Sequence, residues 1–366
     1  MNQSLNIVPL EEWLPKKFDR FIIAGPCGAE TREQVLGTAE EISILNKVSL
    51  FRAGVWKPRT RPNTFEGVGE PALYWLNEVK KKYNLMTAVE VANSGHVELA
   101  LKHGIDVLWI GARTTVNPFS VQEIADAVKG HDIPVLVKNP IHADLQLWVG
   151  AIERVLNSGV KKIAAIHRGF HSMNRGNLRY DPNWQIPIQL KTFFPSLPII
   201  CDPSHIAGER KLIKDIAQRA MDLVMDGLMI ETHISPASAW SDAAQQITPV
   251  LLGELIQSLQ FRSPSSDNLN FKDDLMVLRT EIDQLDAYLF EILEKRNTIT
   301  NRLGQVKKKN NVSIFQLDRW VEILRTRGEW AKEKKLDAVF IEQLCKLLHE
   351  ESMRIQNNIM NQSQKE

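Results

Sequence analysis

Four side chains of the kinds that bind metal ions follow short apolar runs of the sequence. They are a thiol, an imidazole and two carboxylates, at Cys27, His205, Glu231 and Asp242. This mixture of sulfur, nitrogen and oxygen ligands suits a borderline divalent ion such as Mn²⁺, Fe²⁺, Co²⁺ or Zn²⁺. Any one of the four could be an ordinary structural side chain, because a lone cysteine often behaves as a small buried hydrophobe. The metal prediction therefore depends on all four lying at one rim of the fold.

Six basic residues end or follow the same apolar runs. They are Arg52, Lys57, Arg59, Arg113, Lys138 and Arg168, and several are flanked by glycine or proline. A single basic residue usually belongs to a solvated surface. The formal net charge of the whole chain is only +1, so a local cluster of this size indicates a ligand with several negative charges. Since Arg and Lys bind phosphate and carboxylate through charge-assisted hydrogen bonds, two phosphorylated substrates would account for it.

The elements that must position these residues alternate regularly. Apolar runs rich in β-branched residues are separated by amphipathic segments of helical length, a pattern typical of parallel strands covered by helices. We expect strands at 21–26, 48–54, 85–91, 107–113, 134–140, 162–169, 198–204 and 227–234, and helices that include 31–47, 71–83, 120–129 and 145–158. Eight such units predict a (β/α)₈ TIM barrel, whose active site lies at the carboxyl ends of the strands. No G-x-G-x-x-G follows the first strand, which weighs against dinucleotide binding.

The sequence predicts two domains. Residues 1–260 form the barrel, the polar segment 261–272 is a linker, and 273–366 form an all-α domain. In the last part an apolar stripe of one helix includes Leu278, Ile282, Leu285 and Leu289, and further helices are expected near 316–329 and 336–360, the latter capped by Asp337. Because so few helices cannot enclose a large core, we expect this domain to pair with a second copy of itself.

Composition excludes several classes of protein. With 43% hydrophobic and 24% charged residues and a net charge near zero, we expect a soluble enzyme with no nucleic-acid or membrane partner. Three widely spaced cysteines form no C-x-x-C pair, which favours a reducing compartment. The beginning of the sequence has no apolar signal region, so we expect a cytoplasmic location.

The motifs of the barrel region resemble those of the DAHP synthases, a family of phosphoenolpyruvate-condensing barrels. AGPC, KPRT, IGAR, DPSH and IETH with a following SD occur in the order typical of that family. The resemblance implies that phosphoenolpyruvate and erythrose 4-phosphate condense to 3-deoxy-D-arabino-heptulosonate 7-phosphate (DAHP), with the four residues named above as metal ligands. It also implies binding of phosphoenolpyruvate by Arg52, Lys57, Arg113, Lys138 and Arg168, binding of the aldose phosphate by Arg59 and Thr60, and Lys57 as general acid. Asn139 and His167 depart from the family pattern.

Residues from about 273 to 360 resemble the all-helical chorismate mutases. The resemblance rests on LRTEID, EKRN, LGQVK and SMRIQ. It implies rearrangement of chorismate to prephenate in a cage made by Arg279, Arg296, Lys307, Arg319, Ser352 and Gln356, with Lys307 beside the ether oxygen that breaks. It also implies a dimer, because the first arginine of this family reaches the site of the partner subunit. Gln316 and Trp320 stand where many relatives carry acidic residues.

Three hypotheses remain open at this point. The first is a bifunctional DAHP synthase and chorismate mutase. The second keeps the barrel active and makes the helical tail a dimerisation or regulatory module, which could respond to chorismate or prephenate. The third is a related sugar-acid synthase that uses arabinose 5-phosphate, and KPRT weighs against it because the octulosonate synthases carry another motif there.

Overall fold

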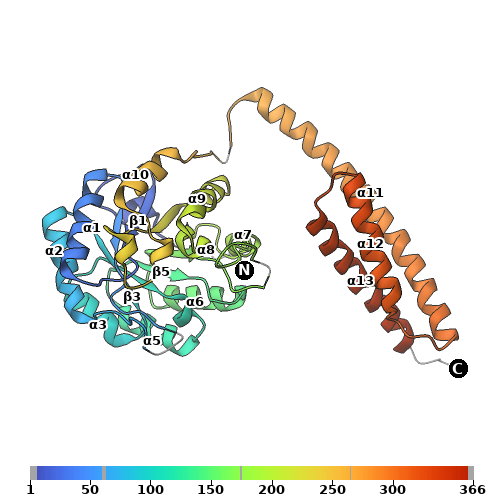
Figure 1. Cartoon of the computed structure of the whole chain (residues 1–366), viewed down its shortest axis with the longest axis horizontal. Helices are drawn as coiled ribbons and strands as arrows, with labels where there is room; N and C mark the ends of the chain where they lie inside the picture. Colours follow the sequence, from blue (N-terminus) through green and yellow to red (C-terminus); the bar gives the residue numbers. More distant parts are fainter. Residues whose placement is uncertain (1–5, 60–62, 174, 264, 362–366) are drawn as a thin grey trace. The chain divides into compact units, whose positions relative to one another are not determined.

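The computed structural model describes residues 6–59, 63–173, 175–263 and 265–361. Its contacts divide the chain into two compact units, Met1–Pro264 and Ser265–Glu366 (Figure 1). The boundary falls inside the segment 261–272 that the sequence predicts to be a linker.

The first unit is a closed parallel barrel. Its strands are β1 (Phe21–Gly25), β2 (Leu50–Arg52), β3 (Thr87–Val91), β4 (Val107–Ile110), β5 (Val135–Lys138), β6 (Ile163–His167), β7 (Ile199–Cys201) and β8 (Gly227–Glu231). Each strand pairs with the next, and β1 pairs with β8 to close the ring. The predicted (β/α)₈ architecture is confirmed. The strands are shorter than expected at their carboxyl ends, because the polar residues there leave the sheet and form the rim.

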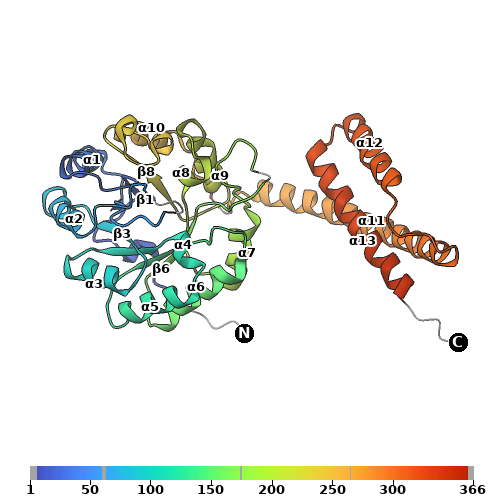
Figure 2. The ribbon, with the colours of Figure 1, turned by 60° about the horizontal axis from the view of Figure 1, so that its bottom comes forward.

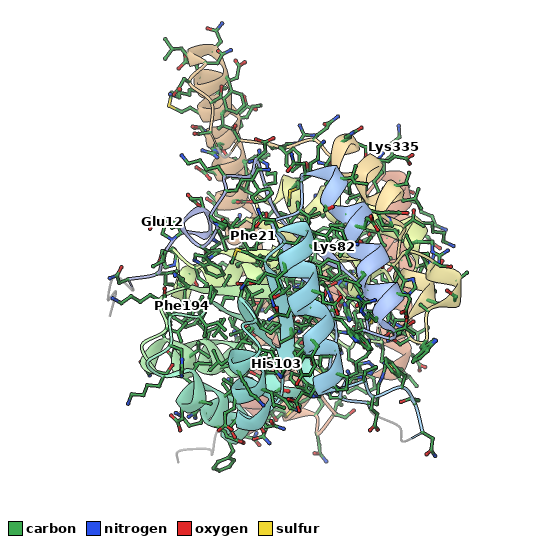
Figure 3. All side chains as sticks on the ribbon, turned by 90° about the vertical axis from the view of Figure 1, so that its left-hand side faces the viewer. Glu12, Phe21, Lys82, His103, Phe194 and Lys335 are labelled. Carbon is green, nitrogen blue, oxygen red and sulfur yellow. The ribbon has the colours of Figure 1, made fainter. Side chains whose placement is uncertain are left out.

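Helices surround the strands as an outer ring (Figure 2). They are α1 (Arg32–Leu45), α2 (Glu70–Tyr83), α3 (Ser94–Lys102), α4 (Ala112–Thr115), α5 (Pro118–Val128), α6 (Leu145–Asn157), α7 (Gln185–Phe193), α8 (Pro203–Ala207), α9 (Ile213–Asp222) and α10 (Pro249–Ser258). Several begin at a side chain that accepts a backbone N–H, such as Asp144 before α6, which satisfies a donor that the first turn leaves free. Adjacent helices also contact each other: His103, labelled in Figure 3, packs edge-on against Tyr74 of α2.

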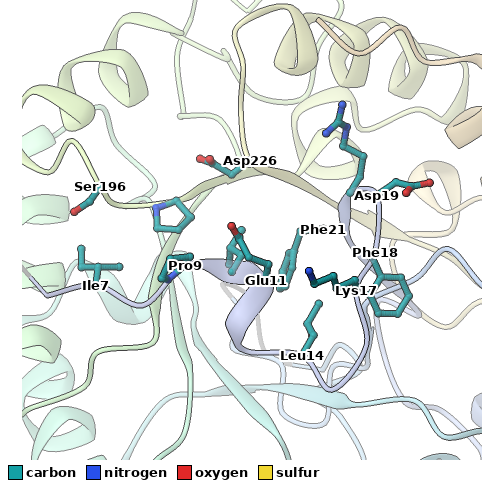
Figure 4. A pocket seen from close by; sticks show the side chains of 13 residues that line it. Ile7, Pro9, Glu11, Leu14, Lys17, Phe18, Asp19, Phe21, Ser196 and Asp226 are labelled. Atoms are coloured by element: carbon teal, nitrogen blue, oxygen red, sulfur yellow. The ribbon is translucent and has the colours of Figure 1, made fainter. Parts of the chain in front are cut away.

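The core has two layers, inside and outside the sheet. Trp109, Leu136 and Met229 fill the barrel, whereas the alternate residues of the strands pack against the helices. A short 3₁₀ helix, η1 (Leu10–Glu12), covers the bottom of the barrel. A cavity of about 570 Å³ lies there, beside Leu14, Phe18 and Phe21 (Figure 4). It opens at the amino ends of the strands and contains none of the predicted site residues.

The second unit consists of three helices, α11 (Leu269–Lys309), α12 (Leu317–Glu333) and α13 (Ala338–Asn361). Helix α11 begins within the predicted linker, because the side chain of Asn268 accepts the backbone N–H of Phe271 and caps the first turn. Asp337 caps α13 as predicted, by accepting the N–H of Phe340 at 2.7 Å. Both α11 and α12 pack against α13. Among the described helices, none combines the length and the apolar character that a bilayer span requires.

Candidate active sites

The four potential metal ligands lie at the carboxyl rim of the barrel, in two close pairs. Cys27 Sγ, after β1, lies 3.2 Å from Oδ2 of Asp242, in the loop that follows β8. His205 Nε2, in α8, lies 3.8 Å from Oε1 of Glu231, the last residue of β8. Within the described ranges, no three Cys, His, Asp or Glu side chains form a ready-made metal cluster. Binding of one ion by all four residues therefore stays a prediction.

The chemistry of these pairs nevertheless fits a divalent ion. Glu231 is fully buried, and its Oε1 accepts no hydrogen bond from the residues that the structure describes. The nearest cation is the Arg52 guanidinium, whose NH2 lies 3.4 Å from Oε1. A buried carboxylate oxygen without a hydrogen-bond donor is costly, so this atom can take a further cationic ligand. Soft and hard ligands also stand side by side, a thiol next to Asp242 and an imidazole next to Glu231, which is the donor mixture expected for a borderline ion.

Cys27 has an unusual electrostatic environment. Its sulfur lies 2.7 Å from the ammonium of Lys57. Lys57 belongs to the loop that follows β2. Burial raises the pKa of the thiol well above its usual range, and the nearby carboxylates of Glu231 and Asp242 raise it further, while Lys57 acts in the opposite direction. The thiol is therefore protonated near neutral pH in the protein alone, and a bound cation would favour the thiolate.

Asp242 is held by a residue that the sequence did not point to. Arg179 donates a hydrogen bond to Oδ1 at 2.8 Å, which leaves Oδ2 beside the Cys27 sulfur. Burial would raise the pKa of Asp242, but Arg179 and Lys57 outweigh it and hold the pKa well below its usual range. The backbone φ of Asp242 is +52°, in the left-handed region that costs energy for most residues other than glycine. The structure thus fixes this carboxylate, ionised, at the rim.

His205 is oriented by a second carboxylate. Its Nδ1 lies 2.8 Å from Oδ2 of Asp202, and the same oxygen lies 3.0 Å from the Lys138 ammonium. Burial lowers the pKa of His205, so the imidazole is neutral at pH 7. A carboxylate behind one ring nitrogen fixes the tautomer and leaves the other nitrogen free to bind a metal ion.

The basic residues at the ends of β2, β5 and β6 are buried. Arg52, Lys138 and Arg168 are each at most 4% exposed. Arg52 and Lys138 both lie over the ring of Trp109, at 4.9 and 5.8 Å from its centroid. Arg52 Nε and NH1, and Arg168 NH1, are buried and have no hydrogen-bond acceptor among the described residues. Buried guanidinium nitrogens that lack an acceptor mark a place where an anion belongs.

Tyr180 connects several of the remaining cations. The Arg168 guanidinium lies 3.7 Å from the centroid of its ring, and Arg179 lies 5.6 Å from it. Burial would raise the pKa of Tyr180, but Arg168, Arg179 and Arg113 lower it. Arg113 therefore belongs to the same positive region, although its side chain is exposed at the rim. Arg179 and Tyr180 are the site residues that sequence reasoning missed. Asp202 belongs to the DPSH motif, but sequence reasoning assigned it no role of its own.

The loop after β2 carries the residues predicted to hold the aldose phosphate. Arg59 lies 3.5 Å from Asp242 through NH1 and donates from Nε to the carbonyl of Phe65 at 2.9 Å. The backbone N–H of Lys57 bonds to the carbonyl of Glu66 across the same loop. These bonds place Lys57 and Arg59 beside the metal-ligand pairs. Thr60, the other predicted phosphate ligand, lies outside the described residues.

The two departures from the DAHP synthase pattern have clear positions. Asn139 is fully buried, accepts the backbone N–H of Arg168 at 2.7 Å and donates to the carbonyl of Gly169 at 2.9 Å. It therefore fixes the turn that presents Arg168. His167 is fully buried against the rings of Phe170 and Trp184. Burial, the main cause, lowers its pKa to about 3, so it adds no charge to the site.

The helical unit gathers part of its predicted set. Lys307, Ser352 and Gln356 are buried where α11 meets α13, and the Lys307 ammonium donates to the carbonyl of Ile314 at 2.6 Å. Burial lowers the pKa of Lys307. Arg296 NH1 and Gln356 Oε1 are buried without a hydrogen-bond partner among the described residues. Arg296, Lys307, Ser352 and Gln356 thus supply buried polar groups where α11 and α13 pack together, and these four residues are called the polar pocket below.

Two predicted residues lie apart from that pocket. Arg319 is exposed and pairs with Glu322 at 2.6 Å. Arg279 is exposed on α11, 17 positions before Arg296. Since an α-helix rises about 1.5 Å per residue, the two arginines are separated by about 26 Å along the helix. Arg279 therefore cannot serve the pocket of its own chain.

A buried cluster of cations at the mouth of a (β/α)₈ barrel, next to acid, imidazole and thiol groups, defines an enzyme that acts on anionic substrates. Comparison with known proteins identifies two enzyme families in the chain. Residues 17–262 match the model of the DAHP synthetase I family, so the chain belongs to that family. Residues 278–357 match chorismate mutase type II. The chain thus combines a DAHP synthase domain with a chorismate mutase domain, and the predictions of both enzyme classes are confirmed.

Individual relatives agree with this assignment. The chain is 31% identical over 239 residues to a phospho-2-dehydro-3-deoxyheptonate aldolase of Thermotoga maritima, which covers 65% of this chain and 68% of the relative. A crystal structure of that DAHP synthase superposes with a TM-score of 0.59 at 30% identity over 65% of this chain and 67% of that one. A 2-dehydro-3-deoxyphosphooctonate aldolase of Wolinella succinogenes is 26% identical and covers 65% of this chain and 97% of the relative.

Proposed function

We propose that the barrel condenses phosphoenolpyruvate with erythrose 4-phosphate and releases inorganic phosphate. The observation that carries the proposal is the set of buried guanidinium nitrogens of Arg52 and Arg168 that lack an acceptor. A carboxylate and a phosphate on one small molecule would supply the missing acceptors. Lys138, beside Arg52 over the Trp109 ring, would add a third positive charge. Burial makes each of these contacts stronger than it would be in water.

The aldose phosphate would bind nearer to the loop after β2. Arg59 faces this side of the site and contacts only Asp242 by an ion pair among the described residues. In this arrangement the two substrates meet above the Cys27 and Glu231 side chains. Holding both anions in place removes much of the entropy cost of a reaction between two molecules.

The divalent ion would be held by Cys27, His205, Glu231 and Asp242. When bound, it would act as a Lewis acid toward the aldehyde oxygen of the aldose. Asp202 would keep the His205 ring in the required tautomer, and Arg179 would keep Oδ2 of Asp242 directed at the thiol. These supporting contacts are of the kind that tunes metal affinity.

Lys57 would supply the proton in the carbon–carbon bond-forming step. Carbon 3 of phosphoenolpyruvate attacks the aldehyde carbon, and the aldehyde oxygen takes a proton from the Lys57 ammonium. Water then adds to carbon 2 and gives up one proton, which restores the Lys57 ammonium. The bond from carbon 2 to the phosphate oxygen breaks as the new hydroxyl becomes the ketone, and the hydroxyl proton leaves with the inorganic phosphate. The buried arginines hold the phosphate and carboxylate throughout, so the chain's main contribution is position and charge.

A direct test of this proposal compares Arg52→Met with Arg32→Met. Arg32 pairs with Glu78 on the exposed outer surface, so its variant is a matched control for loss of one arginine. We expect Arg52→Met to lower the affinity for phosphoenolpyruvate in equilibrium titration by at least about tenfold, since it removes a charged hydrogen-bond donor, and the control to bind normally. Equal binding by both variants would exclude this anion site. Erythrose 4-phosphate should be consumed in preference to arabinose 5-phosphate; the reverse preference would favour the octulosonate-type reaction.

For the helical unit, we propose that the Arg296, Lys307, Ser352 and Gln356 pocket binds chorismate and favours its compact reactive shape. The rearrangement to prephenate needs no covalent catalyst. The Lys307 ammonium would stabilise the negative charge that develops on the breaking ether oxygen. Its present acceptor, the carbonyl of Ile314, would share the ammonium with the substrate, because the ammonium carries three donors.

We further propose that two copies of the chain pair through α11. Leu278, Ile282, Leu285, Leu289 and Ile292 are between 51% and 65% exposed on this helix. An apolar stripe of that length on a three-helix unit requires a cover, and a second α11 offers the same stripe by two-fold symmetry. Such pairing would also bring Arg279 of each chain to the pocket of its partner. Arg279 is too far from Arg296 along α11 to reach the pocket of its own chain.

A further inference from the structure

The pocket of the helical unit contains a polar atom that the proposed function has not used. His349 Nε2 is buried and has no hydrogen-bond partner among the described residues. The same is true of Arg296 NH1 and Gln356 Oε1. Arg296 is close enough to act electrostatically on His349, and Gln356 follows His349 by two turns of α13. Buried polar atoms are nearly always paired, so these unpartnered atoms indicate a ligand that pairs with them. Arg296 and Gln356 are already assigned to chorismate. His349 is not.

The ring of His349 is fixed by two aromatic side chains. It stacks on Trp320 of α12, with centroids 4.3 Å apart and an angle of 23° between the planes. Phe315 meets the same ring at a centroid distance of 6.0 Å and an angle of 66°. Stacking on Trp320 covers one face of the imidazole, and Nε2 at the edge of the ring keeps no partner among the described residues.

His349 also shares the pocket's side of α13. It precedes Ser352 by three positions and Gln356 by seven, a spacing that places all three on one face of a helix. Burial lowers the pKa of His349, and the nearby Arg296 and Lys307 lower it further. The ring is therefore neutral near pH 7, when it offers one donor and one acceptor.

The neutral His349 ring can bind a group of the substrate that the cationic Arg296 and Lys307 do not suit. Arg296 and Lys307 suit the carboxylates and the ether oxygen of chorismate, and the remaining polar group of its ring is a hydroxyl. The residues that would take this hydroxyl by analogy with acidic relatives are Gln316 and Trp320. The Gln316 side chain is exposed. Trp320 has no acceptor atom and instead stacks on the His349 ring.

We propose that Nε2 of His349 hydrogen-bonds the ring hydroxyl of chorismate and so takes over the recognition that an acidic side chain would provide. The inference rests on the proposed mutase function of this pocket. It makes His349 a substrate-binding residue that sets specificity for the hydroxylated ring, with Trp320 as the residue that positions it.

The test uses the full-length chain and two substrates: chorismate, and an analogue in which hydrogen replaces the ring hydroxyl. His349→Phe keeps an aromatic ring against Trp320 but removes both nitrogens. We expect kcat/KM for chorismate to fall about tenfold to a hundredfold in this variant, as for a site that loses one buried hydrogen bond. The analogue should be turned over equally well by the wild type and His349→Phe, and His349→Asn should recover part of the activity on chorismate.

Other outcomes overturn specific parts of the argument. An equal loss on both substrates would mean that His349 only supports the fold of the pocket, and no loss on either would mean that it does not touch the substrate. A wild-type chain without mutase activity would instead contradict the proposed function of the pocket itself. Synthase activity measured on each variant reports whether the preparation is intact.

Discussion

The ammonium of Lys57 lies 2.7 Å from the sulfur of Cys27, although the two residues are 30 positions apart in sequence. The contact joins a proposed proton donor to a proposed metal ligand. It also places a positive charge where a divalent ion would sit against the thiol. Metal binding and the release of Lys57 toward the substrate are therefore expected to be linked.

Replacement of Lys57 tests its role as general acid. We expect Lys57→Ala to lower kcat of the synthase reaction by about 10²–10⁴, the usual contribution of a positioned proton donor. Lys57→Arg should not restore it, because a guanidinium does not give up its proton at these pH values. Affinity for Mn²⁺ should not fall, since the ammonium competes with the ion for the thiol. Chorismate rearrangement by the same chain is the internal control, and a Lys57→Ala variant with more than half of the wild-type kcat would remove Lys57 from the mechanism.

Arg179 is expected to act on the metal site through Asp242. Arg179→Met leaves the Asp242 carboxylate without its 2.8 Å partner, so Oδ2 is no longer directed at Cys27. We expect Mn²⁺ affinity, measured by competition with a chelating dye, to weaken about tenfold to a hundredfold, as is usual when a residue that hydrogen-bonds a metal ligand is removed. The surface variant Arg32→Met should bind like the wild type. An unchanged dissociation constant in Arg179→Met would show that Asp242 needs no such support.

His167 predicts a pH dependence of stability. Its pKa in the folded protein is about 3 because it is buried, whereas the unfolded chain titrates near 6.5. The unfolded state therefore binds the extra proton first, and stability is lost as pH falls below about 6.5. By linkage, lowering the pH from 7.5 to 5 should cost about 2 kcal/mol of unfolding free energy from this group.

His167→Phe should abolish that part of the pH dependence. The measurement is denaturant-induced unfolding of wild type and variant at pH 7.5 and pH 5. The change in unfolding free energy between the two pH values is then compared between the two proteins. His142→Phe, at an exposed position, is the control and should keep the wild-type slope. If His167→Phe loses as much stability on acidification as the wild type, the buried imidazole is not the cause.

Subunit complementation tests the pairing of α11. Arg279→Ala and Lys307→Ala chains should each lack mutase activity. When they are co-expressed, half of the dimers are mixed and each mixed dimer has one complete site, so about a quarter of the wild-type activity should return. Arg302→Ala, exposed on the same helix, should remain active alone. A mixture that stays inactive, or a wild-type chain that sediments as a monomer, would contradict the shared site.

The rim of the barrel could be predicted because parallel strands impose it. Once the apolar runs were placed side by side, residues that end them, such as Cys27, Lys138 and Glu231, had to lie on one edge. Asp337 was likewise predictable, since a cap depends only on local sequence. Strands and caps predicted in this way are found in the structure, and only the first and last residues of the elements differ.

Arg179 and Tyr180 could not be found in the same way. They belong to the irregular segment between β6 and α7, where no period relates sequence to position. Their roles arise from contacts with Asp242 and Arg168, 63 and 12 positions away. His349 was missed for another reason: a histidine on an amphipathic helix is usually part of the apolar contact, and only its unpartnered Nε2 beside Trp320 distinguishes it.

The proposed synthase mechanism requires that Cys27, His205, Glu231 and Asp242 bind one divalent ion together. Titration of the metal-free chain with Co²⁺, followed by absorption, tests it most directly, because a cobalt–thiolate bond gives a charge-transfer band. We predict one ion per chain with that band, its loss in Cys27→Ser, and a Cys27→Ala chain whose synthase activity added Mn²⁺ does not restore. A chain that binds no stoichiometric ion, or full synthase activity in metal-free Cys27→Ala, would contradict the account.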